Sequence, residues 1–122
     1  MVHLNGVITV DEKVGQSEII DIQRIVEACK EKWYNTTLCS VNDSLVRLGI
    51  FEGEFHWHHH DNEDEFFFVV SGKLLLDLPE GTIELDQFQG YTVPKGIEHR
   101  TRAEEKTIVL MVETDTVKPR GD

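Results

Sequence analysis

Residues 53–72 read GEFHWHHHDNEDEFFFVVSG, and the rest of the chain is organised around this stretch. Four histidines stand within five positions (56, 58, 59 and 60), and an acidic turn over residues 61–64 follows them. Glu65 then opens an aromatic and β-branched run that predicts a buried strand over residues 66–70. Because side chains alternate along a strand, we expect His58 and His60 to project from one face, with Glu65 reaching the same space from the returning strand. Two imidazoles and a carboxylate that converge in this way are typical of a metal site.

A second stretch, VPKGIEH at residues 93–99, reads as strand, tight turn and strand, and it delivers His99. A histidine pair alone is more often a solvated surface patch, and it is this distant fourth donor that favours a metal site. His59 should point to the opposite face, into packing or solvent. His56 shares the parity of His58 and is a candidate for a supporting proton donor or acceptor.

Together these two stretches resemble the paired motifs of the cupin family. HHH, four residues, Glu65, six residues and Gly72 are similar to the first motif, and Pro94-Lys95-Gly96, two residues and His99 are similar to the second. The resemblance covers roughly residues 42–114 and implies an all-β fold, a double-stranded β-helix or jelly-roll-like barrel. It also implies that the metal is held by His58, His60, Glu65 and His99.

The chain departs from the family pattern at turns and not at the ligands. The glycine ahead of the first ligand histidine is displaced to Gly53, the leading glycine of the second motif falls on Phe88, and its trailing asparagine position holds Ala103. Imidazole and carboxylate without thiolate suit a divalent transition metal, and Zn, Mn, Fe, Ni and Cu all remain open.

Composition limits the possible partners. At 122 residues the chain is long enough for one core, and 12 basic against 23 acidic residues give a net charge of −11. That balance argues against a nucleic-acid partner and an anionic membrane surface. The N-terminus lacks the pattern of a signal peptide, so we expect a cytoplasmic location. Cys29 and Cys39 are then expected to be reduced core residues and not ligands.

The chain divides into three expected segments: a strand and helix extension over residues 1–40, the barrel over 41–114 and a loose polar tail over 115–122. Apolar residues at three- and four-residue steps predict one helix over residues 17–33, capped by Asp21, with Lys30 and Lys32 near its C-terminal end, covering a mouth or the outer face of the barrel. Short strands with turn residues between them fill the rest, including two separate ones over residues 99–102 and 107–113.

Several residues are candidates for the walls of the pocket. By alternation Phe67 and Val69 should follow Glu65 inward, and Met111, Leu48 and Ile50 are plausible neighbours. These side chains can equally be filling of a small barrel. Arg47 and Arg102 are candidate anchors for an anionic substrate, although a lone arginine is more often a surface charge.

Two classes of function remain open. The first is a small metalloenzyme that acts on a small organic molecule, because the resemblance implies oxygenases, isomerases and epimerases. The second is a non-enzymatic module that binds a small ligand or sugar. We also expect a homodimer, because a short barrel leaves strand edges exposed and the β-prone segment over residues 2–10 is placed to join a neighbouring sheet.

Overall fold

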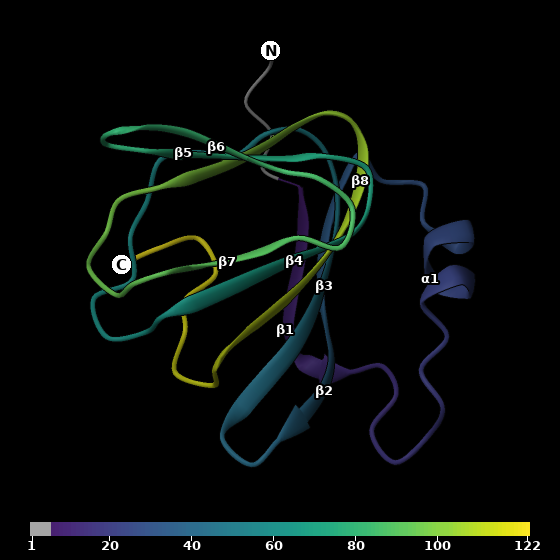
Figure 1. The fold of residues 1–122 in the computed structure, drawn as a ribbon. Coiled ribbons are helices and arrows are strands. Elements are labelled where there is room, and N and C mark those ends of the chain that lie inside the picture. Colours follow the sequence, from purple (N-terminus) through teal and green to yellow (C-terminus); the bar gives the residue numbers. More distant parts are fainter. Residues whose placement is uncertain (1–5) are drawn as a thin grey trace.

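The computed structural model describes residues 6–122 and is built from strands, with one short helix on the outside (Figure 1). In chain order the elements are β1 (Val7–Lys13), α1 (Ile22–Ala28), β2 (Trp33–Val41), β3 (Ser44–Glu54), β4 (Glu65–Ser71), β5 (Leu74–Leu78), β6 (Gly81–Leu85), β7 (Gly90–Val93) and β8 (Arg100–Thr114). The sequence therefore predicted the fold class correctly, and the turn at Asn42 and Asp43 lies where expected, between β2 and β3.

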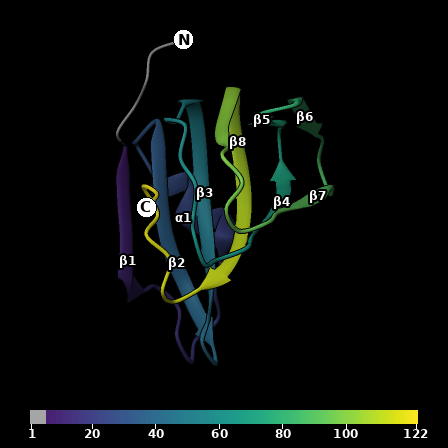
Figure 2. The same cartoon turned by 90° about the vertical axis from the view of Figure 1, so that its left-hand side faces the viewer.

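The long strand β8 holds the barrel together because it pairs with three other strands. The strands follow the order β1-β2-β3-β8-β4-β7, and β5 pairs with both β6 and β8. The first half of β8 pairs with β5, and its second half lies between β3 and β4 (Figure 2). The expectation of two separate strands here was wrong, since residues 100–114 form one strand, although its pairing with β3 shifts register between Phe51 and Gly53.

Alternation along the strands divides the apolar residues into two clusters. Phe67, Val69 and Met111 belong to the inner cluster, as expected. Leu48 and Ile50 do not: they belong to a second cluster on the outer face of the sheet, where α1 packs. The physical reason is the parity of β3, which turns Phe51 inward and consequently its even-numbered residues outward.

The helix is shorter than the periodicity suggested, Ile22–Ala28 in place of residues 17–33. Asp21 is the N-cap, and its Oδ1 accepts a hydrogen bond from the backbone N–H of Arg24 at 3.2 Å. Cys29 is already extended, so Lys30 and Lys32 lie beyond the helix. Trp33 is drawn into β2, where its ring stacks on Phe51 with 4.2 Å between centroids. Core packing therefore overrides the helical periodicity at this end.

The first described strand and the residues after β8 both join the barrel. Residues 7 and 8 of β1 pair in parallel with β2 of the same sheet, whereas residues 2–5 of the expected exchange segment lie outside the described residues. The tail is not loose: Val117 is buried, and the N–H of Asp115 bonds to the carbonyl of Asp43 at 2.9 Å. Within residues 6–122, no helix has the length and apolar character needed to cross a membrane.

Candidate metal centre

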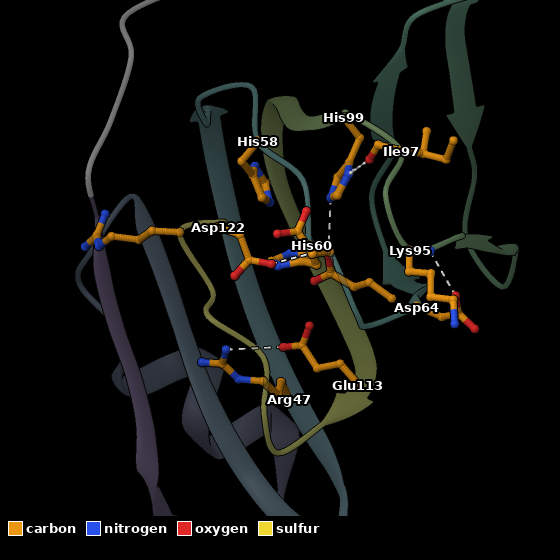
Figure 3. Close-up of polar contacts among 12 residues, drawn as sticks. Arg47, His58, His60, Asp64, Lys95, Ile97, His99, Glu113 and Asp122 are labelled. Atoms are coloured by element: carbon orange, nitrogen blue, oxygen red, sulfur yellow. Dashed lines mark hydrogen bonds and ion pairs between the residues drawn. The ribbon is translucent and has the colours of Figure 1, made fainter.

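The four predicted donors, His58, His60, Glu65 and His99, lie close together, and Figure 3 shows the three histidines among them. His58 and His60 stand on the connection between β3 and β4, Glu65 is the first residue of β4, and His99 directly precedes β8. One ligand atom of each residue lies within 4.8 Å of those of the other three. The arrangement follows from a backbone bridge between the two motifs, in which the N–H of His58 bonds to the carbonyl of His99 at 2.9 Å and the reverse bond measures 2.8 Å.

The local structure of the histidine run differs from the expected strand. β3 ends at Glu54, and His58 takes part only in the isolated bridge to His99. His60 is held separately, because its carbonyl accepts a bond from the N–H of Gly96 at 2.8 Å. The expected parity nevertheless holds for His59, which turns away from the cluster and places Nε2 3.0 Å from Asp61 Oδ1.

Two of the imidazoles are oriented as metal ligands require. His58 Nδ1 lies 3.0 Å from the carbonyl oxygen of His56, and His99 Nδ1 lies 2.9 Å from that of Ile97. A carbonyl oxygen only accepts, so Nδ1 carries the proton in both rings and Nε2 keeps its lone pair. His99 Nε2 is 3.2 Å from Glu65 Oε1, so the free lone pair faces the carboxylate. This is the arrangement by which an outer hydrogen bond fixes a ligating histidine.

His60 is buried beside Glu65, and its ring nitrogens are available to a cation. Its Nε2 lies 3.3 Å from Glu65 Oε1, outside hydrogen-bond geometry, and among the described residues neither ring nitrogen has a hydrogen-bond partner. A buried imidazole with two unsatisfied nitrogens is costly unless something binds it. Three nitrogens and one carboxylate are a donor set for a divalent transition metal, so the residues present fit the expected ion.

The electrostatics of the cluster are uneven. Burial, followed by the nearby His99, lowers the pKa of His58 to about 4. Burial also acts to lower the pKa of His60, but the Glu65 carboxylate, with Asp122 and Glu63, outweighs it and the pKa is raised. Burial opposes ionisation of Glu65, yet His60 and His99 lower its pKa well below the ordinary value. Without metal, the site therefore holds an ionised carboxylate, a neutral His58 and a His60 that readily keeps a proton.

Glu113 is a site residue that the sequence reasoning missed. Its side chain is buried on β8, where Figure 3 shows it beside Arg47, and it interacts electrostatically with Glu65. Burial, followed by the negative charge of Glu65, raises the pKa of Glu113 well above the ordinary value, and the nearby Arg47 only partly opposes this shift. We therefore expect Glu113 to hold a proton more readily than an ordinary carboxyl group. Strand parity was the available signal, since Glu113 lies two residues beyond the inward-facing Met111.

Neither candidate arginine is a free anion anchor. Arg47 is fully buried, with Nη1 3.4 Å from Glu113 Oε1 and Nη2 donating to the carbonyl oxygen of Thr9 at 2.6 Å. Arg102 is bound to Asp77, with Nε 2.7 Å from Oδ2. Both guanidinium groups are thus already in contact with carboxyl side chains.

A small cavity adjoins the metal centre. Its volume is about 20 Å³, and it is lined by Trp33, Asn35, Phe51, Phe55, His58, Glu65, Phe67, Thr101, Met111 and Pro119. This volume holds about one water molecule. We call this space the inner chamber.

The C-terminal residues close the chamber and surround the histidines. Pro119 forms part of its wall, and a Cβ on Gly121 would lie 2.5 Å from the Cβ of His58. His56 Nε2 is 2.6 Å from the carbonyl oxygen of Arg120, so the His56 ring contacts this segment while its backbone carbonyl orients His58. The N–H of Asp122 bonds to the carbonyl of His59 at 2.9 Å. Residues 115–122, which we call the closing segment, therefore cover the site.

Comparison with known proteins agrees with this architecture. A family model described as "Cupin domain" matches residues 45–114. The chain is 41% identical over 98 residues to the uncharacterized protein YdbB of Bacillus subtilis. This alignment covers 80% of this chain and 87% of that protein.

Solved structures show the same fold. A cupin-2 domain containing protein from Shewanella frigidimarina superposes with a TM-score of 0.74 and 30% identity, over 79% of this chain and 94% of that one. Protein NMB1881 from Neisseria meningitidis gives a TM-score of 0.70 and 26% identity, over 80% and 99% of the two chains.

Proposed function

The chain belongs to the cupin family, and from the donor cluster in its barrel we propose that it is a metal-dependent enzyme acting on a small organic molecule by oxygenase- or isomerase-type chemistry. The observation that carries the proposal is the orientation of the imidazoles. His58 and His99 each donate the Nδ1 proton to a backbone carbonyl. The lone pair on Nε2 is therefore available to bind a metal, and in His99 it lies beside the Glu65 carboxylate.

The ligand count supports a catalytic over a structural ion. Four protein donors on a six-coordinate ion leave two positions open, whereas a closed structural site is typically tetrahedral and rich in cysteine. Cys29 is remote from the donors, in the cluster on the outer face of the sheet. When bound, the ion would supply Lewis acidity or a coordination position for a reactant.

The chain's own residues supply the remaining functions. Glu65 provides the negative charge that offsets a cation. Glu113 interacts with Glu65 and is itself in contact with Arg47, so these two side chains form the polar surroundings of the carboxylate. The aromatic rings around the inner chamber exclude water from the reacting molecule. Exclusion of water strengthens every electrostatic interaction in the site.

Elemental analysis of protein purified without a histidine tag tests the proposal. We expect about one transition-metal ion per chain in the wild type and almost none in the His60→Ala, His99→Ala double variant, with the fold retained by circular dichroism. Equal metal content in the two proteins would overturn the proposal.

The identity of the bound ion then distinguishes between the two types of reaction. Iron together with substrate-dependent oxygen uptake would favour an oxygenase, and manganese or zinc an isomerase. A folded wild type that takes up no transition metal would favour the alternative, a module that binds a small ligand or sugar without catalysis.

A further inference from the structure

Asn35 is a buried polar residue whose side chain has no hydrogen bond within the described part of the chain. It stands on β2 and lines the inner chamber, and only 9% of its surface is exposed. Its Oδ1 is inaccessible and has no partner among residues 6–122. Such a group costs free energy unless something satisfies it, so an orphan amide at the wall of a site requires an explanation.

Aromatic rings form part of the wall of the chamber that Asn35 lines. Trp33 stacks on Phe51 at 4.2 Å and on Phe55 at 5.6 Å, with interplanar angles of 18° and 6°. Gly49 pairs with Asn35 in the sheet, and a Cβ there would lie 2.2 Å from the Phe51 ring. The glycine therefore leaves room for the ring, and the chamber keeps a planar aromatic wall.

The chamber offers no unpaired cation. Of the described residues that line it, none is a lysine or arginine, and the nearby Arg47 is paired with Glu113. Glu65 adds negative charge at the metal end. A negative charge placed away from the metal would therefore meet no cationic side chain in the chamber wall, whereas an uncharged body needs none.

We propose that Asn35 determines substrate specificity by accepting a hydrogen bond from an uncharged, planar substrate that carries a hydroxyl or N–H donor. One end of the molecule binds at the metal, its flat body lies against the aromatic wall, and its donor reaches the carboxamide oxygen of Asn35. This inference rests on the proposed metal site. Because the chamber holds about one water molecule, Pro119 and its segment must shift to admit such a substrate.

The competing explanation is a structural water that satisfies Asn35 permanently. The two explanations differ in their effect on binding. A site built to receive a donor rejects an analogue that lacks it, because the buried acceptor is then left unpaired. A water already bound to Asn35 would make the donor irrelevant.

Two matched ligands test the proposal on the zinc-loaded full chain. Resorcinol carries two hydroxyl groups, so that one can lie at the metal while the other donates, and 3-methoxyphenol has lost one of these donors. We expect calorimetry to show about tenfold tighter binding of resorcinol to the wild type, equivalent to about 1.4 kcal/mol. Asn35→Leu should reduce this preference to about one, and Asn35→Asp, which keeps the acceptor and the shape, should retain it.

Controls separate this inference from folding and from the metal site. Asn62→Leu makes the same change in the exposed acidic turn and should leave the preference intact. Zinc content and melting temperature are measured for each variant, and Asn35→Ala, which also lacks an acceptor, replaces Asn35→Leu if the latter does not fold. A wild type that binds zinc but shows no preference, or binds neither ligand at millimolar concentration, overturns the role of Asn35. A wild type that binds no zinc overturns the proposed function instead.

Discussion

The backbone of each motif orients its own histidine. His58 and His99 donate Nδ1–H to carbonyls two residues earlier in the chain, those of His56 and Ile97. No second side chain is needed to select the tautomer, in contrast to sites where an outer carboxylate does so. The orientation of the donors therefore depends on the conformation of two short loops, and the backbone bridge between His58 and His99 fixes both at once.

The raised pKa of His60 predicts that metal uptake depends on pH near neutrality. The ordinary value is 6.5, and the folded value lies above it, so metal-free protein holds a proton on His60 that an incoming ion must displace. Affinity should thus fall about tenfold per pH unit below the folded pKa, starting above pH 6.5. His58 adds nothing in this range, because its pKa is about 4.

Calorimetric titration of zinc checks this prediction. Repeating the titration at pH 6 in buffers of different ionisation enthalpy should reveal the release of about one proton per ion. His60→Ala should bind weakly and lose this proton release. An affinity that is constant between pH 6 and 8 would contradict the assigned shift.

The histidine run also predicts unequal roles for neighbouring residues. His59 faces Asp61 and not the cluster, so His59→Ala should keep the metal content of the wild type. His58→Ala removes a donor and should reduce affinity at least tenfold. Both variants are measured by elemental analysis after dialysis against a weak chelator. Equal loss of metal in the two would mean that the register around residue 58 is different.

The sequence was sufficient to predict site residues that occur at a characteristic spacing. It was not sufficient for residues whose role depends on how the folded chain packs. The four donors could be named from the two motifs. Glu113 was overlooked although strand parity from Met111 leads to it, and Asn35 gave no signal because an asparagine near a strand start is usually a turn residue. Burial without a partner is a property of the folded chain alone.

At the scale of elements, the closing segment differs most from what the sequence predicted. Its polar composition predicted a loose tail, yet residues 115–122 contact the histidine run and the acidic turn at several points. Thr116 Oγ1 donates to Glu63 at 2.8 Å, and Asp122 accepts a bond from the N–H of Asp61. These contacts are with loop residues far away in sequence, so local composition could not reveal them. The shortened helix has the same origin, because packing of Trp33 on Phe51 takes that end of it into β2.

The closing segment predicts that its removal exposes the chamber. Trp33 is 2% exposed and lines the chamber with Pro119. The chain has 2 tryptophans, so a Trp57→Phe background leaves Trp33 as the sole reporter. Deleting residues 118–122 in that background, while keeping the buried Val117, should increase acrylamide quenching of Trp33 severalfold.

The control for this experiment is the full-length Trp57→Phe protein, which should show little quenching. Circular dichroism should give the same spectrum for both proteins, because the deletion lies beyond the last strand. Unchanged quenching after the deletion would show that the segment does not limit access to the chamber.

At the scale of the whole molecule, one sheet connects the segments expected at 1–40 and 41–114. β2 pairs with β3 from Val41 opposite Ser44 to Trp33 opposite Phe51. Arg47 on β3 reaches the carbonyl of Thr9 on β1 and the carboxyl group of Glu113 on β8. The first strand therefore contributes to the support of the metal centre, through Arg47 and Glu113 to Glu65.

This connection bears on the predicted homodimer. β1 stands at one end of the strand order, so one of its edges is paired with β2 and the other has no partner strand among residues 6–122. Unpaired edges invite pairing with another chain, and we retain the prediction that two copies associate through β1. Deleting residues 1–10 would be a poor test, because it removes the Thr9 carbonyl that Arg47 needs.

A charged substitution on the edge strand is a sharper test. Val7 is 38% exposed on β1, and Val7→Lys places a charge at the expected contact, a change that natural edge strands use to prevent association. Val41→Lys is the matched control, since Val41 is 58% exposed at the β2–β3 turn, away from that edge. Light scattering at micromolar concentration should give twice the 14.0 kDa of one chain for the wild type and for Val41→Lys. Val7→Lys should fall toward 14.0 kDa, and a wild type that already scatters as a single chain would refute the dimer.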